Sequence, residues 1–285
     1  NHSYKYYQER KMGPRRKFRE KRNDGKEDTV IMAAFRKFAD ELDTKHDKHE
    51  RIVKISRDIT IESKRLIFSL HSLLRNDDIS EASEKIKEGL RKIILTHFTN
   101  ITLELENEDP YQYLRAFSPG LQEFIEAITL YSFIVKNGTL FTWGDVKEEL
   151  NVHVDIRRDK PDGPPEIIGT RRLQGPVPLT EYILGIEDLT GELMRLAIGQ
   201  LGAGKFNAAL KTTTFVKYIY TGLLLLSHVQ SREFVKKLSI VRQSLDKMEY
   251  ACYVMHVRGS EVQAHPSQFS STSMPLPLSQ DCLDI

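Results

Sequence analysis

The chain has 285 residues, of which 40% are hydrophobic and 29% are charged. This apolar content is enough for one large helical domain or two small ones. The first 30 residues are polar and predict no secretory signal. The best candidate for a membrane span, residues 116–135, contains a proline and two glutamates, which a membrane helix would carry at high cost. We therefore expect no membrane association. The two cysteines make neither a zinc set nor a disulfide framework, and they indicate a reducing compartment.

The net charge of +2 hides an uneven distribution along the chain. Residues 1–26 contain ten Lys and Arg against three Asp and Glu, whereas the remainder contains 32 basic against 37 acidic residues. The segment "RKMGPRRKFREKR" at 10–22 cannot bury a core, and we expect it to be disordered. It is either a nuclear-localisation or nucleic-acid-binding arm, or a solvated tail. Because the body is mildly acidic, RNA would have to meet a local site or a surface supplied by a partner.

The predicted order is a basic disordered arm at 1–27, a helical domain at 28–260 and a disordered tail at 261–285, which is rich in Ser and Pro. The hydrophobic periodicity predicts an all-α bundle of about seven helices. The first reaches about residue 76, as one long helix or as two with a break near 43–49. Residues 152–176 are rich in Pro and Gly and predict a loop. The other helices are expected at about 78–106, 118–136, 142–150, 178–201, 207–228 and 231–258.

Capping residues give the expected ends of several helices. Ser118 as N-cap and Pro119 at the first position predict a helix start, and Thr142 caps the short helix that follows. Gly138 and Gly259 predict helix ends. The core face of the first helix is expected to contain Val30, Ile31, Ala34, Phe35, Phe38, Leu42, Ile52, Ile55, Ile59, Leu66, Leu70 and Leu73.

Three motifs are better explained by structure than by function. "GQLGAGKF" at 199–206 matches a phosphate loop, but Phe206 stands where Ser or Thr should hold Mg²⁺ and a helix precedes it, so we expect a turn between helices. His46 and His49 have a spacing that could bind metal, yet no third ligand is near in sequence, and a solvated face is the simpler interpretation. Cys252 lies in an apolar helix and is interpreted as a core residue.

Two acid pairs carry the functional prediction. The helix "GLQEFIEAITLYSFIV" is apolar on nearly every side, and Glu123 and Glu126, three residues apart, are the only charged residues between 116 and 135. In "DLTGEL", Asp188 and Glu192 lie one helical turn apart beside a leucine stripe. Buried carboxylates normally contact a cation or a metal, so the alternative to a metal site is glutamates that face solvent or pair with arginines of other helices.

Four carboxylates on two helices would suit Mg²⁺ or Mn²⁺, which prefer hard oxygen ligands. The chain contains no Glu-x-x-His sequence, which argues against a di-iron centre. A metal held there could activate water and stabilise charge on an attacked phosphate. Gly191 lies between the two acids of the second pair, and its missing side chain would let another helix or a phosphate backbone approach them. Arg195 could touch a phosphate, or it could simply pair with Glu192 or Asp188.

The segments "GLQEFIEAI", "EDLTGELMR", "KKLSIVRQSLDKMEYACY" and "VRGSE" closely resemble the translin family, and within it the translin-associated factor X branch. The resemblance spans roughly residues 28–261. It implies an all-helical subunit that assembles with translin into a closed hetero-oligomeric shell. It also implies Mg²⁺-dependent endoribonuclease activity on single-stranded RNA, in small-RNA passenger-strand removal with the RNA-silencing machinery and in tRNA processing, in the cytoplasm and the nucleus.

By the same resemblance, Glu123, Glu126 and Asp188 match the family's catalytic acids, while Glu126 and Glu192 match its metal ligands. The segment 152–176 does not resemble the family, and nothing is carried over there. The rival hypothesis is a non-catalytic scaffold, which would use its helical faces only to assemble with translin and to hold nucleic acid.

Overall fold

The computed structural model describes residues 29–73, 79–136, 138–160, 163–226, 228–229 and 231–264. The predicted arm at 1–27 and most of the predicted tail at 261–285 lie outside these residues. The chain divides into two units, Asn1–Asp47 and Lys48–Ile285. The division falls within α2 (Val30–Leu73), which is one continuous helix rather than two.

In the first unit, the described residues form the beginning of α2. The apolar side chains predicted for its core face are exposed: Val30 is 88% exposed, and Phe35, Phe38 and Leu42 are exposed as well. The prediction that they belong to the core is therefore wrong for the structure of this chain alone. Periodicity marks an apolar face, but it does not say whether another element covers that face.

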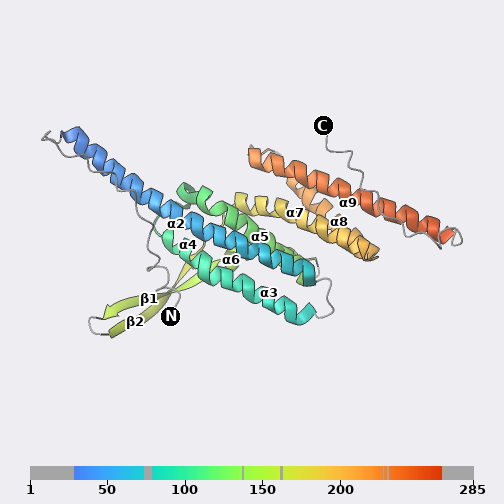
Figure 1. The fold of residues 1–285 in the computed structure, drawn as a ribbon, viewed down its shortest axis with the longest axis horizontal. Coiled ribbons are helices and arrows are strands. Elements are labelled where there is room, and N and C mark those ends of the chain that lie inside the picture. The colour runs from blue at the N-terminus through green and yellow to red at the C-terminus, as the bar shows by residue number, and fades with distance from the viewer. Residues whose placement is uncertain are drawn as a thin grey trace. The chain divides into compact units, whose positions relative to one another are not determined.

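The second unit contains the rest of α2 and most of the remaining elements (Figure 1). A π-helical segment, Ile94–Phe98, joins α3 to α4 without interruption, so the described residues contain seven separate α-helices and one two-stranded sheet. This confirms the predicted all-α bundle. The elements after α2 are α3 (Ile79–Ile93), α4 (Thr99–Glu104), α5 (Leu114–Val135), α6 (Trp143–Glu149), β1 (Asn151–Lys160), β2 (Gly163–Gln174), α7 (Leu179–Gly202), α8 (Phe206–Leu224) and α9 (Arg232–Ala264).

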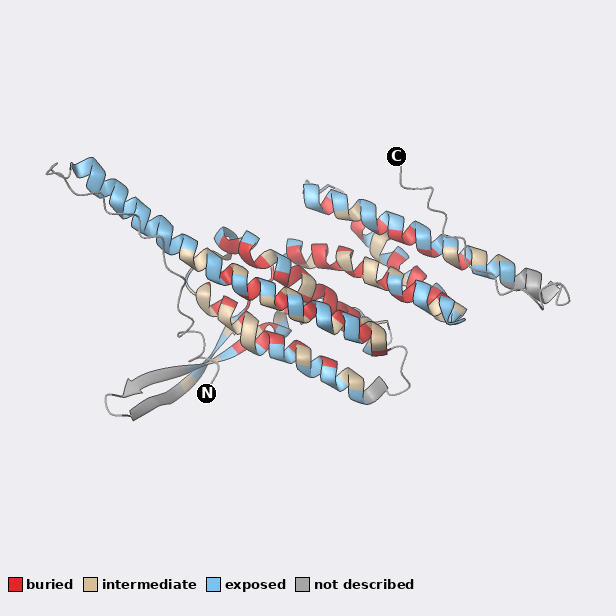
Figure 2. Ribbon diagram, viewed as in Figure 1, coloured by how far each residue is buried: buried red, intermediate tan, exposed pale blue. Residues whose placement is uncertain are grey.

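The core of the second unit forms around α5 and α7, which pack against each other. α5 is buried along most of its length, as its apolar sequence predicts (Figure 2). α7 also packs against α8 and α9, and α5 contacts α3. Leu189 and Leu193, the stripe beside the second acid pair, are completely buried. The two helices that carry the acid pairs are thus held together by a buried apolar contact.

The start of α5 differs from the prediction at Ser118 and Pro119. Pro110 instead begins a short 3₁₀ helix, Pro110–Tyr113, whose N-cap Asp109 accepts a hydrogen bond from the Tyr111 amide, and α5 follows at once. Pro119 therefore lies inside the helix. The capping signal at Asp109 and Pro110 competes with the one at 118–119, and the apolar side chains that precede Ser118 are buried when the helix starts earlier.

Other boundary signals give a mixed result. Thr142 and Asp145 form a capping box at the start of α6, as predicted in part from Thr142. Gly138 adopts a φ of 89° after α5, which ends at Val135, and this confirms the predicted stop. Gly259 does not end its helix, because α9 continues to Ala264. Glycine is unfavourable in a helix interior by only about 1 kcal/mol, which a long helix tolerates.

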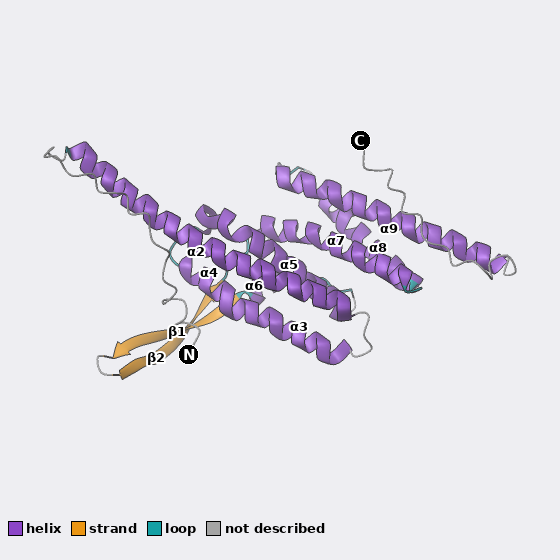
Figure 3. Cartoon of the chain, viewed as in Figure 1, coloured by secondary structure: helices purple, strands orange, loops and turns teal. Residues whose placement is uncertain are grey.

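The predicted loop at 152–176 is wrong, since β1 and β2 form an antiparallel hairpin there (Figure 3). Val152 pairs with Leu173 in the register, and Val152 is buried. The hairpin satisfies its backbone hydrogen bonds internally, so proline and glycine in the segment do not prevent strand pairing. Glu106 holds Arg171 of β2 by an ion pair at the base of the hairpin.

Residues 203–205 form the expected turn between α7 and α8, in which Gly204 has a φ of 72°. A helix precedes this turn, whereas a phosphate loop follows a strand, and this agrees with the prediction that the segment is not a phosphate loop. Within the described parts of the chain, none of the helices combines the length and apolarity that crossing a membrane would require.

Candidate functional site

The first acid pair lies in the middle of α5, with its two carboxylates in different surroundings. Glu123 is partly exposed and pairs with Lys64 of α2, whose ammonium lies 3.0 Å away. This contact raises the pKa of Lys64. Glu126 is only 9% exposed, and the described residues offer its carboxylate no hydrogen bond or ion pair. One acid of the pair is therefore neutralised from another helix, and the other is left without a partner.

Burial, together with the negative charges of Glu123, Asp188 and Glu192, raises the pKa of Glu126 to about 8, although Lys237 acts to lower it. Two of these acids, Asp188 and Glu192, belong to α7 and act on the carboxyl of Glu126 in α5. The structure thus brings the two predicted pairs together across the contact between α5 and α7. Glu126 is the centre of this group of four acids, which we call the acid site.

The acids of α7 also contact basic side chains. Asp188 Oδ2 lies 2.6 Å from Nζ of Lys237, which comes from α9. His71 Nε2 donates to Glu192 Oε2 at 2.6 Å, and Arg195 lies 3.3 Å from the same oxygen. The alternative to a metal site, pairing with other helices, therefore occurs at three of the four acids, through lysine and histidine, whereas Arg195 belongs to the same helix as Glu192.

The chemistry of the acid site fits a hard divalent cation in kind, because it offers carboxylate oxygens and a buried carboxylate without a partner. Its present geometry does not form a closed shell: among the described residues, no group of three or more His, Cys, Asp or Glu side chains is placed to hold a metal ion. The acids instead face Lys64, His71 and Lys237.

Sequence reasoning missed these basic residues. Lys64 and His71 are seven residues apart in α2 and so lie on one face of that helix, opposite the acids of α5 and α7. They are separated in sequence from Glu123 and Glu192 by 59 and 121 residues. The only indication in the sequence is that Lys64 and His71 lie among apolar residues of a helix, and this pattern is a weak predictor of a functional site.

Sequence reasoning also missed Glu187, which precedes Asp188 in α7. Its side chain is buried, the residue being 3% exposed, and neither carboxylate oxygen has a hydrogen-bond partner in the part of the chain that the structure describes. The pKa of Glu187 is raised to about 8, mainly by burial and in addition by Asp188 and Glu233, although Lys237 acts to lower it. We leave Glu187 outside the acid site, because its charge does not act on Glu126 to a comparable extent.

The raised pKa of Glu187 predicts a pH-dependent stability. Between about pH 4.5 and pH 8 the folded state binds a proton that the unfolded state releases, so the free energy of unfolding falls as pH rises through this window. Glu187→Gln removes this titration, and we expect its stability relative to wild type to increase by on the order of 2 kcal/mol from pH 5 to pH 8. Urea unfolding of the purified protein at both pH values measures the difference. An equal effect of Glu88→Gln, which changes an exposed glutamate, would contradict the assignment to burial.

Two glycines of α7 differ in their surroundings, and of the two predicted roles of Gly191 the structure excludes only the close approach of another helix. A Cβ on Gly191 would meet nothing within 4 Å, so no helix approaches there, and the space beside the acids is open. The close approach is at Gly185, where a Cβ would lie 2.7 Å from Cγ2 of Ile125 and 3.2 Å from the carbonyl oxygen of Gln122. Gly185 therefore sets the distance between α5 and α7 next to the acid site.

This difference between the glycines is testable. Gly185→Ala should destabilise the fold by about 1–3 kcal/mol, because the added methyl group forces α7 away from α5. Gly191→Ala adds the same group in open space and should stabilise the fold by up to about 1 kcal/mol. Urea unfolding compares the two variants, and equal effects would show that the helix contact at Gly185 is not tight.

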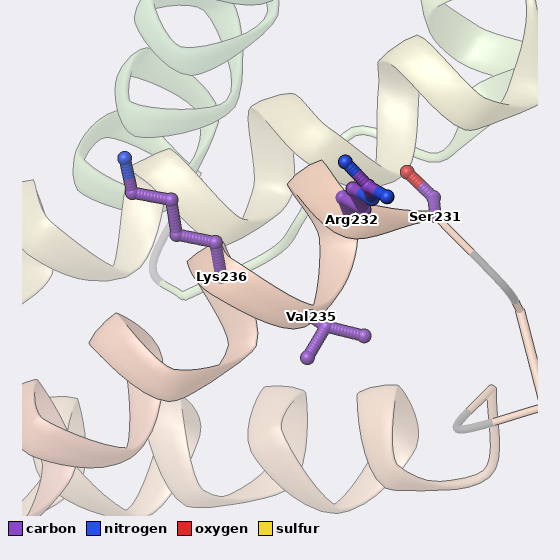
Figure 4. Close-up of a pocket in the computed structure, with 4 residues that line it drawn as sticks. All are labelled: Ser231, Arg232, Val235 and Lys236. Atoms are coloured by element: carbon purple, nitrogen blue, oxygen red, sulfur yellow. The ribbon is translucent and has the colours of Figure 1, made fainter.

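The start of α9 adds basic groups to the same unit. Ser231, Arg232, Val235 and Lys236 line a shallow surface hollow, and Arg232 and Lys236 point to the same side of α9 (Figure 4). Lys236 directly precedes Lys237, which reaches Asp188. Arg195 is also exposed. Exposed cations thus lie on α7 and at the start of α9.

Known proteins resemble this chain over most of its length. The sequence model of the Translin family matches residues 47–259. The "Translin-associated protein X" of Rattus norvegicus is 38% identical over 251 residues, which cover 85% of this chain and 84% of the relative. The "Translin" of Mus musculus is 22% identical over 223 residues, covering 76% of this chain and 89% of that protein.

The fold is also similar to a solved structure, "Structure of AfC3PO - duplex RNA complex". The TM-score is 0.55 with 19% sequence identity, and the match covers 79% of this chain and 97% of that one. At this identity the likeness concerns the fold alone, and it agrees with the helical bundle described above. From the matches of sequence over most of the chain, we conclude that this protein belongs to the Translin family.

Proposed function

We propose that this chain is the catalytic subunit of an endoribonuclease that it forms with translin, and that it cleaves single-stranded RNA with the help of Mg²⁺ or Mn²⁺. The observation that carries the proposal is the acid site: Glu126 is buried without a partner, and the charges of Glu123, Asp188 and Glu192 act on it. Such an assembly of carboxylates is unfavourable for stability alone, and a functional role is the expected reason for it.

In this proposal, Glu126, Glu123, Asp188 and Glu192 supply the oxygens that hold the metal. A bound divalent ion would lower the pKa of a water molecule and stabilise negative charge on the attacked phosphate. The four acids would otherwise repel a polyanion, so RNA is tolerated only when their charge is balanced. The opening above Gly191 gives the RNA backbone room to approach them.

Exposed cations of α7 and α9 would contact the RNA phosphates. Arg195 lies beside Glu192, and Arg232 and Lys236 line the hollow at the start of α9. Arginine and lysine contribute to RNA affinity mainly through phosphate contacts, which weaken as salt increases. A relative of the same fold is in a complex with duplex RNA, as its name states. We carry RNA binding over to this chain, and we place the contact on these side chains.

Translin is the proposed partner, as the name of the rat relative, "Translin-associated protein X", indicates. Several large apolar side chains of α8 and α9 are exposed in the chain by itself, and assembly would cover them. The biological reactions we propose are passenger-strand removal with the RNA-silencing machinery and tRNA processing.

We further propose that the protein works in both the cytoplasm and the nucleus, and that the basic segment at 1–26 directs nuclear entry. Deleting residues 1–26 should lower the nuclear fraction of a fluorescently tagged protein while most of the RNA cleavage persists. Complete loss of cleavage at moderate salt would contradict this division of roles. A partial loss that grows with salt would mean that the arm contacts phosphates.

The direct test is to co-express the chain with translin, establish the assembly by native mass spectrometry, and incubate it with 5′-labelled single-stranded and duplex RNA. We expect cleavage of the single strand with Mg²⁺ and none after EDTA treatment. Absence of cleavage with either metal would contradict the enzymatic proposal.

A non-catalytic scaffold is the second candidate, and one observation favours it. Three of the four acids contact Lys64, His71 or Lys237 instead of one another. A scaffold of this kind would bind RNA and assemble with translin without cleaving RNA. The two functions therefore differ in the cleavage assay and agree in the assembly assay.

A further inference from the structure

Lys237 is the most enclosed of the lysines that contact the acid site. Its side chain is 17% exposed, although it belongs to a long helix with a mainly exposed outer face. The ammonium lies 2.6 Å from Asp188 Oδ2 and 2.8 Å from Gln122 Oε1. It is also 3.5 Å from the carbonyl oxygen of Leu184 and 3.9 Å from Glu233. Oxygens from α5, α7 and α9 thus surround this one ammonium group.

The oxygens around Lys237 are themselves held in place. The amide nitrogen of Gln122 donates to Glu181 Oε2 at 2.7 Å and to Ser118 Oγ at 3.1 Å, which turns its oxygen toward Lys237. Ser118 also donates to Glu181. Gln122 and Glu181 are both buried. The lysine therefore occupies a position for a cation that a hydrogen-bond network fixes across three helices.

Lys64 contacts the acid site in a different way. Its side chain is 63% exposed, and its ammonium has a single acidic contact, Glu123. An exposed ion pair of this type contributes little to the stability of the fold, because water and salt screen the attraction between its charges. Lys64 and Lys237 thus each place a positive charge beside one acid of the site. Only the charge of Lys237 is shielded from solvent by the surrounding helices.

Lys237 and a metal ion would compete for the same oxygen of Asp188, Oδ2. Mg²⁺ binds oxygen at about 2.1 Å. The Lys237 ammonium lies 2.6 Å from the same oxygen, so the two positive charges would be close together and would repel each other. We propose that Lys237 is the internal counter-cation of the acid site, and that its ammonium and a divalent metal ion occupy the Asp188 carboxylate alternately. This inference rests on the proposed metal-dependent function.

Alternate occupancy by Lys237 explains why the repulsion among the four carboxylates does not separate α5 from α7 when no metal is bound. The ammonium balances part of the acidic charge, and it lowers the pKa of Glu126 as well. Metal binding then requires that this ion pair opens, so Lys237 sets the metal concentration at which the site fills. Lys237 is in this sense a positioning residue of the site, since it acts through Asp188.

The test measures metal binding in the absence of RNA. Mn²⁺ is titrated into the complex with translin and free Mn²⁺ is measured by electron paramagnetic resonance, for wild type, Lys237→Met and Lys64→Met. Methionine keeps most of the apolar stem and removes the charge. We expect Lys237→Met to bind Mn²⁺ about tenfold more tightly than wild type, and Lys64→Met to change the dissociation constant by less than about twofold.

The outcomes separate this inference from the proposed function. If wild type binds Mn²⁺ and Lys237→Met binds it equally or more weakly, the competition is contradicted while the metal site stands. If neither protein binds Mn²⁺, both are contradicted. Circular dichroism and native mass spectrometry show whether Lys237→Met folds and assembles.

A second measurement uses the wild-type complex and needs no variant. An amine-reactive reagent is applied briefly with and without Mg²⁺, and the labelled lysines are quantified by peptide mass spectrometry. We expect Mg²⁺ to raise the labelling of Lys237 severalfold, because its ammonium leaves an enclosed ion pair, and to leave Lys217, which pairs with Glu249 away from the acid site, unchanged. No increase at Lys237 at saturating Mg²⁺ would overturn the alternate occupancy.

Discussion

Glu126→Gln is expected to reduce RNA cleavage by about a thousandfold or more while assembly with translin is retained. The substitution keeps the size of the side chain and removes a charge that lies at the centre of the acid site. Folding should not suffer, because the buried carboxylate has no partner in the described residues and repels its acidic neighbours. Asp188→Asn should have a similar effect on cleavage.

Glu187→Gln is the matched control for this substitution. The chemical change is the same, the side chain is also buried, and the residue precedes Asp188 in α7. We expect its single-turnover cleavage rate to remain within about threefold of wild type, since Glu187 is outside the acid site. Equal losses of cleavage in both variants would point to general disturbance of the contact between α5 and α7, and would contradict the specific role of Glu126.

Charged substitutions on α9 are expected to abolish assembly with translin. Tyr250 and Tyr253 are 70% and 65% exposed, and their spacing places them on one face of the helix. Replacing both with glutamate should weaken assembly by about a hundredfold or more, because aromatic side chains contribute strongly to interfaces and buried carboxylates oppose them. The chain alone is for the same reason expected to be poorly soluble or inactive.

Co-purification and native mass spectrometry measure the assembly of this variant. Gln112→Glu adds one negative charge at an exposed position outside α8 and α9 and should assemble normally. Undiminished assembly of the double tyrosine variant at the wild-type stoichiometry would show that translin does not cover this face. The exposed apolar side chains of α8 and α9 are Leu210, Tyr218, Leu224, Val235, Ile240, Tyr250, Tyr253 and Met255.

The helices and the two acid pairs could be predicted from the sequence because they depend on local spacing. An apolar helix with two glutamates three residues apart must bury at least one of them, and Glu126 is buried. Helical periodicity likewise placed Leu189 and Leu193 in the core. Such features need only the residues of one helix.

The basic half of the acid site could not be predicted, because it depends on which helices meet. Lys237 is 49 residues from Asp188, and His71 is 121 residues from Glu192. Their sequence surroundings do not differ from those of an ordinary solvated lysine or a core histidine. The contact of Gly185 with Ile125 likewise depends on how α5 and α7 cross. From the sequence alone, the close approach was predicted at Gly191 instead.

The errors at the start of α5 and at the hairpin have a different origin, which is competition between local signals. The signal of Ser118 and Pro119 was outweighed by Asp109 and Pro110 together with burial of the residues between them. In the hairpin, proline and glycine indicated a loop, although alternating apolar residues such as Val152 and Val154 could also pair in a strand. Tertiary burial decided both cases.

The central claim is that this chain, and not its partner, performs the chemistry. The most direct test is single-turnover cleavage of single-stranded RNA by complexes in which translin is wild type and this chain is either wild type or the double variant Glu126→Gln/Asp188→Asn. We predict Mg²⁺-dependent cleavage that EDTA abolishes in the wild-type complex, and no measurable cleavage by the double variant in an intact assembly. Near-normal, EDTA-resistant cleavage by the double variant would contradict the account.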